Sequence, residues 1–149
     1  MKKQLMEMLE ARKDEMIQIR RYLHENPEVS FQEEKTAQYI LDFYKEKNVE
    51  IQSNVGNGHG IIITIKGGKP GKTIALRADF DALPILEETE LPFKSKNDGV
   101  MHACAHDGHT AYLMILADCL IQLKDEIAGT IKIIHQHAEE VPPGGANSI

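Results

Sequence analysis

The run of β-branched residues at Ile61–Ile65 is the sequence feature that most limits the folds this chain can adopt. Five almost continuously apolar residues are typical of a strand whose two faces are both covered. The period becomes helical at residues 107–124, where apolar side chains occupy most sides and predict a buried helix. Further strands are predicted at residues 49–55, 73–77 and 129–135. Strands that alternate with long helices favour an α/β fold with a partly parallel sheet and helices on both faces.

The N-terminal part of the chain is predicted to form two helices. Apolar residues recur at spacings of three and four over the first 25 residues, which indicates an amphipathic helix that ends near Pro27. Ser30 and Glu33 have the spacing of a capping box, a serine whose partner glutamate lies three residues on. A second helix is therefore predicted at residues 31–47.

Length and composition limit the class of protein. The 149 residues suit one compact domain, and 23 acidic against 17 basic residues give a net charge of −6. That charge argues against nucleic acid or an anionic membrane as the main partner. Cys104 and Cys119 are too few for a disulfide framework, so a reducing, cytoplasmic compartment is expected. No span approaches the roughly 18 apolar residues of a membrane helix.

Residues 102–109 hold three of the seven histidines and one of the two cysteines. A single histidine is more often a surface or capping residue, but imidazole and thiolate together suit zinc or another divalent first-row metal. Cys104 and His106 lie two residues apart, so on an extended backbone their side chains project to the same side. The cluster as a whole predicts a metal site.

Two acidic pairs follow predicted strands, where the chemistry of α/β sheets tends to gather. Asp79 and Asp81 come after one strand, where they suit either turn chemistry or the support of a metal-bound histidine ring. Glu139 and Glu140 come after another, and a pair of this kind is usually a solvated loop. Neighbours on an extended chain point in opposite directions, so one would bind metal while the other holds a water.

Three motifs occur in a fixed order along the chain: RADFDALP at residues 77–84, MHACAHDGHT at residues 101–110 and QHAEE at residues 136–140. Together they resemble the amidohydrolase branch of the metallopeptidase family that includes aminoacylases, hippurate hydrolases and auxin-conjugate hydrolases. The segment at residues 23–33 also resembles that branch. The resemblance implies a zinc-exopeptidase-like catalytic domain of which residues 1–149 are the N-terminal part, without the inserted lid or dimerisation domain.

The resemblance also implies the activity, which is hydrolysis of the amide bond of N-acyl amino acids or short peptides. Cys104, His106 and Glu140 would be metal ligands, Glu139 the general base, and Asp81 the acid that supports the metal site. Two divalent ions (zinc, manganese, cobalt or nickel), about 3.5–4 Å apart, would polarise the carbonyl and activate a water. The full-length protein would be a homodimer or another homo-oligomer.

The chain departs from the family pattern at three points. Ala105 replaces a common glycine, His137 replaces a usual proline and adds a possible ligand, and the chain stops at Ile149. Three ligands are too few for two ions, so the chain by itself is expected to bind metal weakly and to be inactive. Two other readings stay open: a non-catalytic metal-binding or structural remnant, and a thiol hydrolase that uses Cys104 with a neighbouring histidine.

Overall fold

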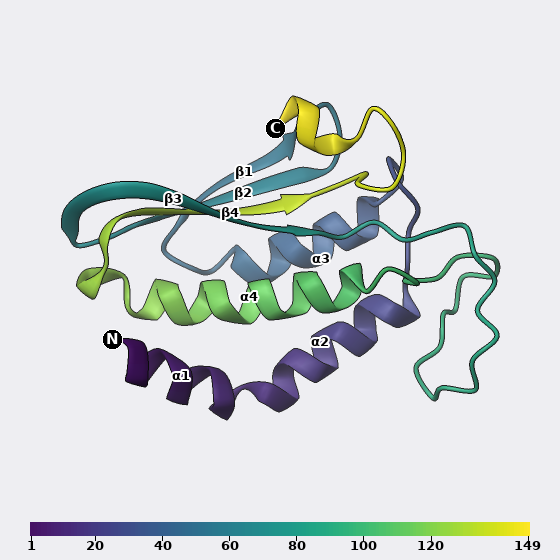
Figure 1. The fold of residues 1–149 in the computed structure, drawn as a ribbon, viewed down its shortest axis with the longest axis horizontal. Coiled ribbons are helices and arrows are strands. Elements are labelled where there is room, and N and C mark those ends of the chain that lie inside the picture. Colours follow the sequence, from purple (N-terminus) through teal and green to yellow (C-terminus); the bar gives the residue numbers. More distant parts are fainter.

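A computed structural model describes residues 1–149, which form a four-stranded sheet with four helices on one face (Figure 1). The strands are β1 (Glu50–Val55), β2 (Gly60–Lys66), β3 (Lys69–Asp79) and β4 (Ala128–Gln136), and their order in the sheet is β1-β2-β4-β3. β2 is antiparallel to both of its neighbours, whereas β3 and β4 are parallel. The predicted α/β class with a partly parallel sheet is confirmed.

The helices form two layers beneath the sheet. They are α1 (Lys2–Ala11), α2 (Lys13–Glu25), α3 (Glu34–Tyr44) and α4 (His106–Gln122), with two short 3₁₀ helices, η1 (Lys124–Glu126) and η2 (Gly145–Ser148). α3 and α4 pack on the sheet, and α1 and α2 lie on the outer side of α4 (Figure 1). None of these helices is long and apolar enough to cross a membrane.

Alternate side chains of β2 belong to the core that the helices cover, although the strand is buried on both faces. Ile61, Ile63 and Ile65 alternate along the strand and are buried in the core that the helices cover. Burying one such side chain contributes about 1.5–3 kcal/mol. Helices on both faces were expected, but in these 149 residues the opposite face carries a hollow of about 430 Å³ where Arg77 and Lys132 lie among apolar residues.

The N-terminal segment is two helices rather than the single helix predicted. The break falls at Arg12, whose backbone has φ −109° and ψ 14° and whose guanidinium donates hydrogen bonds to Glu15 and to Asp118 of α4. Asp118 also pairs with Lys47 at 2.7 Å, so this carboxylate joins three parts of the helical layer. The apolar spacing continues across the break, which is why the sequence pattern does not reveal it.

The predicted capping box is wrong. Phe31 has a φ of +66°, a left-handed conformation that no α-helix contains, so α3 begins only after it. Glu28 takes the capping role instead, because its carboxylate accepts hydrogen bonds from the amide and the hydroxyl of Thr36, both at 2.8 Å. The side chains of Ser30 and Glu33 turn inward and are buried.

The parallel pair of strands determines where the polar segments meet. Asp79 at the end of β3 lies opposite Gln136 at the end of β4, and the amide of Phe80 donates to the carbonyl of Gln136 at 3.0 Å. The hydroxyl of Thr110, in the first turns of α4, donates to the carbonyl of Asp79 at 2.8 Å. The chain therefore leaves both strands, and enters α4, at a single edge of the sheet.

We predict that His135 makes the stability of this fold depend on pH. The ring is fully buried on β4, its Nε2 lies 3.1 Å from the hydroxyl of Tyr44, and burial lowers its pKa to about 3. Below about pH 6.5 the unfolded chain, with an ordinary histidine pKa, binds a proton at His135 that the folded chain does not bind. The stabilising contribution is complete above about pH 6.5 and is lost as the pH falls toward 3, by up to about 1.4 kcal/mol per pH unit.

The measurement is urea unfolding of the wild type and of His135→Gln between pH 7.5 and 4.5. Other acidic groups titrate in both proteins, so the free energy of unfolding of the wild type is compared with that of the variant at each pH. The advantage of the wild type is expected to shrink as the pH falls. A difference that stays constant over this range would contradict the prediction.

Candidate metal centre

The structure brings the sulfur, imidazole and carboxylate expected to share an ion to one place. Cys104, His106 and Glu140 each offer one donor atom, and these atoms all lie within 4.8 Å of one another. Ala105 makes this possible, because its φ of +64° turns the chain sharply between Cys104 and the first residue of α4. Cys104 is exposed, Glu140 is partly buried and His106 is buried.

The two adjacent glutamates both approach the same imidazole nitrogen. Nε2 of His106 lies 3.7 Å from Oε1 of Glu140 and 4.0 Å from Oε2 of Glu139. On an extended chain these side chains would diverge, but residues 139 and 140 lie in a bend that follows the left-handed backbone of Ala138, whose φ is +46°. They are not equivalent, since the Glu139 side chain is 40% exposed and the Glu140 side chain 20%.

Asp81 holds the imidazole of His106 from its other side. Nδ1 of His106 lies 2.9 Å from the backbone carbonyl of Asp81 and 3.2 Å from its Oδ1. Because both neighbours are acceptors, the ring proton resides on Nδ1, and Nε2 is left to face the glutamates. Oδ2 of Asp81 accepts hydrogen bonds from the hydroxyl of Ser30 at 2.7 Å and the amide of Glu140 at 3.0 Å.

The charges at this edge favour a cation. Burial acts to raise the pKa of Asp81, but its hydrogen bonds with His106, Ser30 and the Glu140 amide outweigh burial and hold that pKa well below its usual range. Burial acts to lower the pKa of His106, but the hydrogen bond with Asp81 and the nearby charges raise it to about 9. The carboxylates thus stabilise positive charge at the imidazole, where a metal ion and a proton would compete.

The residues present fit a divalent metal ion. Oε1 of Glu140 is buried and has no hydrogen-bond partner, which costs free energy unless a cation or a donor satisfies it. One thiolate, one imidazole and one carboxylate form a donor set that suits zinc and other first-row divalent metals.

Asp79 lies beside the centre and makes contacts that the sequence did not indicate. Its Oδ1 accepts a hydrogen bond from Nδ1 of His109 at 2.7 Å, and its Oδ2 lies 3.2 Å from Nη2 of Arg77. Asp79, His106 and His109 form a second group whose donor atoms lie within 4.8 Å of one another. His109 was part of the predicted cluster, but its spacing gave no indication of this partner.

His137 is not the extra ligand that its place in the sequence suggested. Its ring is fully buried, both ring nitrogens lack a hydrogen-bond partner, and it belongs to neither group of possible ligands. The ring instead fills a space bounded by four glycines: Gly56, Gly58, Gly60 and Gly145. Lack of side chains at these positions lets the loop after β4 approach the turn between β1 and β2.

The state of Cys104 does not favour a thiol nucleophile. Its pKa is raised, first by a hydrogen bond with Glu140 and then by burial and neighbouring carboxylates. A nucleophilic cysteine needs the opposite shift, toward the thiolate. A metal-bound sulfur is also a thiolate, so what favours a ligand role is the closeness of the Cys104 sulfur to the donor atoms of His106 and Glu140.

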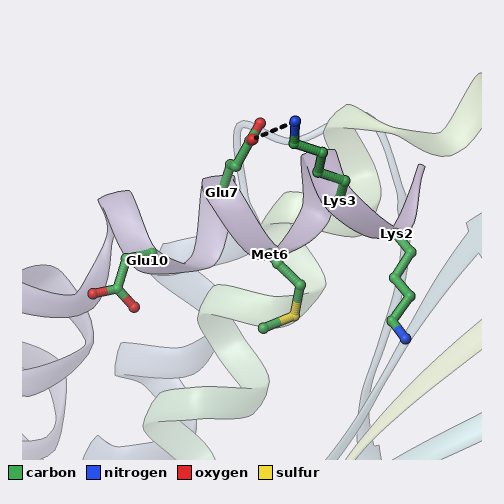
Figure 2. Close-up of a pocket in the computed structure, with 5 residues that line it drawn as sticks. All are labelled: Lys2, Lys3, Met6, Glu7 and Glu10. Atoms are coloured by element: carbon green, nitrogen blue, oxygen red, sulfur yellow. Dashed lines mark ion pairs between the residues drawn. The ribbon is translucent and has the colours of Figure 1, made fainter.

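One wide surface hollow lies on α1, away from Cys104, His106 and Glu140. It has a volume of about 690 Å³ and is lined by five residues of α1: Lys2, Lys3, Met6, Glu7 and Glu10 (Figure 2). Figure 2 shows Lys3 and Glu7 paired, at 3.8 Å, while Met6 points away from that pair. One exposed helix forms the whole lining and offers neither histidine nor cysteine, so this hollow is not a candidate site.

Comparison with known proteins places these residues in a family context. The sequence model of peptidase family M20/M25/M40 matches residues 75–149. An N-acyl-L-amino acid amidohydrolase of Geobacillus stearothermophilus is 44% identical over 148 residues, which are 99% of this chain and 40% of that protein.

Solved structures of two proteins are also similar to this chain. The crystal structure of a protein from methicillin-resistant Staphylococcus aureus has 59% sequence identity to this chain and a TM-score of 0.96. The match covers 99% of this chain and 38% of that one. The YXEP protein of Bacillus subtilis, described as a dinuclear metal-binding peptidase of the M20 family, is 47% identical with a TM-score of 0.84, over 91% of this chain and 38% of that one. The chain thus spans about two-fifths of the length of the relatives it matches.

We predict that Gly58 and His137 are energetically coupled. A Cβ at Gly58 would lie 2.2 Å from Nε2 of the His137 ring, which is fully buried. Gly58→Ala is therefore expected to lower the free energy of unfolding by about 1–3 kcal/mol. In a His137→Ala background, where the ring is gone, the same change is expected to cost much less. Denaturant unfolding of the four proteins measures the coupling, and strictly additive losses would contradict it.

Proposed function

Because the chain belongs to peptidase family M20/M25/M40, we propose that the complete protein is a metal-dependent amidohydrolase that cleaves the amide bond of N-acyl amino acids or short peptides. The observation that carries the proposal is the approach of the Cys104, His106 and Glu140 donor atoms to within 4.8 Å of one another. The named activity of the Geobacillus relative and the dinuclear metal binding of the Bacillus structure support it. That residues 1–149 are the N-terminal part of the catalytic domain is included in the proposal.

Cys104, His106 and Glu140 are the proposed ligands of a two-ion centre that takes zinc, manganese, cobalt or nickel. Bound divalent ions supply a water of lowered pKa and polarise the scissile carbonyl. Asp81 keeps the ring proton of His106 on Nδ1, so that Nε2 stays available as a donor atom. Ser30 and the Glu140 amide hold Asp81 in place for this task.

Glu139 is the proposed general base. It is the more exposed of the two glutamates, and its carboxylate accepts no hydrogen bond from the rest of the protein, so the oxygens are free to take a proton. In the proposed reaction Glu139 takes a proton from the attacking water and later delivers it to the leaving nitrogen. Glu140 is held in place by its own amide on Asp81, which suits a ligand better than a proton carrier.

The base assignment predicts a specific loss in Glu139→Gln. The complete protein with this change is expected to keep its metal, since the three ligands are unaltered, but to lose turnover by about 10²–10⁴-fold. Metal content is measured by elemental analysis, and turnover by release of the free amino acid from an N-acetyl amino acid. Glu88→Gln, at an exposed position away from the centre, is the control and should match the wild type. Retained turnover in Glu139→Gln would remove Glu139 from this role.

The number of ligands leads to a second prediction. Cys104, His106 and Glu140 are too few to hold two ions at a fixed separation, so the 149-residue chain by itself is expected to bind metal weakly and to have negligible amidase activity. Calorimetric titration of this chain with zinc or manganese measures the affinity. Tight binding of two ions would contradict the prediction.

A non-catalytic remnant of the same fold is the alternative to the proposed enzyme. It would bind metal in the complete protein but would hydrolyse neither N-acyl amino acids nor short peptides, with or without added metal.

The expected cytoplasmic location, the expected homodimer or other homo-oligomer and the absence of a nucleic-acid partner stay predictions.

A further inference from the structure

Glu33 has a buried carboxylate that the proposed chemistry does not use. The residue is fully buried, although the sequence pattern assigned it to the start of a helix. Its Oε1 accepts a hydrogen bond of 2.8 Å from the amide of Ala138, 105 residues further along the chain. Burial raises the pKa of Glu33, so enclosing this side chain is costly and calls for a compensating contact.

The amide that donates to Glu33 belongs to Ala138, whose backbone conformation directs the chain into Glu139 and Glu140. Ala138 has a φ of +46°, and a left-handed conformation costs about 1–2 kcal/mol for a residue that carries a Cβ. Glu33 holds the amide of Ala138, and the amide of Gly145 donates to its carbonyl at 2.8 Å. The bend is therefore held on both sides, immediately before Glu139 and Glu140.

Asp81 provides an indirect link between the same two segments. Ser30 lies three residues before Glu33 and donates to the Asp81 oxygen that also accepts the amide of Glu140. Between them, the left-handed backbone of Phe31 lets Ser30 and Glu33 both face inward while Phe31 itself stays exposed. The turn at residues 30–33 thus contacts the loop at residues 138–140 directly through Glu33, and indirectly through Asp81, which binds both Ser30 and the Glu140 amide.

We propose that Glu33 is a positioning residue, whose acceptance of the Ala138 amide holds the bend that directs Glu139 and Glu140 toward Nε2 of His106. This inference rests on the proposed function of the metal centre. What matters at Glu33 is an acceptor atom at the correct reach rather than the negative charge. A purely structural role would lower stability and leave the metal affinity and turnover of the folded protein unchanged.

Two conservative variants of the complete protein separate reach from charge. Glu33→Gln keeps the chain length and a carbonyl acceptor but removes the charge, whereas Glu33→Asp keeps the charge and is one methylene too short. Glu34→Gln, at the exposed neighbouring position, is the matched control. The measurements are cobalt(II) affinity of the metal-free protein, the absorption spectrum of bound cobalt(II), kcat and KM for an N-acetyl amino acid, and thermal stability.

The expected pattern is that Glu33→Gln and Glu34→Gln stay within threefold of the wild type in cobalt(II) affinity and kcat. Glu33→Asp is expected to lose at least tenfold in both, with KM within threefold and an altered cobalt(II) spectrum. The inference is overturned if Glu33→Asp matches the wild type, if only thermal stability changes, or if Glu33→Gln is as impaired as Glu33→Asp or fails to fold. A wild type that binds no cobalt(II) would overturn the proposed function itself.

Discussion

Parallel pairing of β3 with β4 brings the carboxyl ends of two strands to one edge of the sheet, with Asp79 opposite Gln136. In an antiparallel pair, one strand would end at that edge and the other would begin there, so only one carboxyl end would lie at it. The connection between the two strands also contains α4, whose first residue is His106. The segments that carry Asp81, His106 and Glu140 meet because of this topology, although they are far apart in the sequence.

Hydrogen bonds then decide how these side chains face one another. Asp81 contacts the His106 ring, the Ser30 hydroxyl and the Glu140 amide, so one carboxylate orients an imidazole and fixes a loop. Glu33 adds a second buried carboxylate at the same loop. Carboxylates in such surroundings are costly to bury, and each accepts hydrogen bonds from a distant part of the chain, although Oε2 of Glu33 is buried without a partner. The site is therefore a network in which local strain, as at Ala138, is balanced by contacts between segments.

Periodicity and residue type were sufficient to predict much of this arrangement. The β-branched run at residues 61–65 and the apolar helix at residues 107–124 lie as predicted, because their patterns reflect burial that the core imposes. The closeness of Cys104, His106 and Glu140 was also expected, because the family resemblance implies that they share a metal site. The roles of the three side chains rest on the proposal made above.

Other features depend on partners that no local pattern contains. Ser30 and Glu33 have the spacing of a helix cap, yet their partners are Asp81 and an amide 105 residues away. The residue type alanine gives no indication that the backbone of Ala138 is left-handed. His137 was named as a possible extra ligand, whereas its ring is surrounded by glycines of the β1–β2 turn and of the loop after β4.

The central claim is that Cys104 shares a metal ion with an imidazole and a carboxylate. X-ray absorption at the zinc edge of the zinc-loaded complete protein tests this claim directly. The account predicts a sulfur neighbour at about 2.3 Å alongside nitrogen and oxygen neighbours at about 2.0–2.2 Å, with the sulfur lost in Cys104→Ser. A zinc environment made only of nitrogen and oxygen in the wild type, or a sulfur that persists in Cys104→Ser, would contradict it.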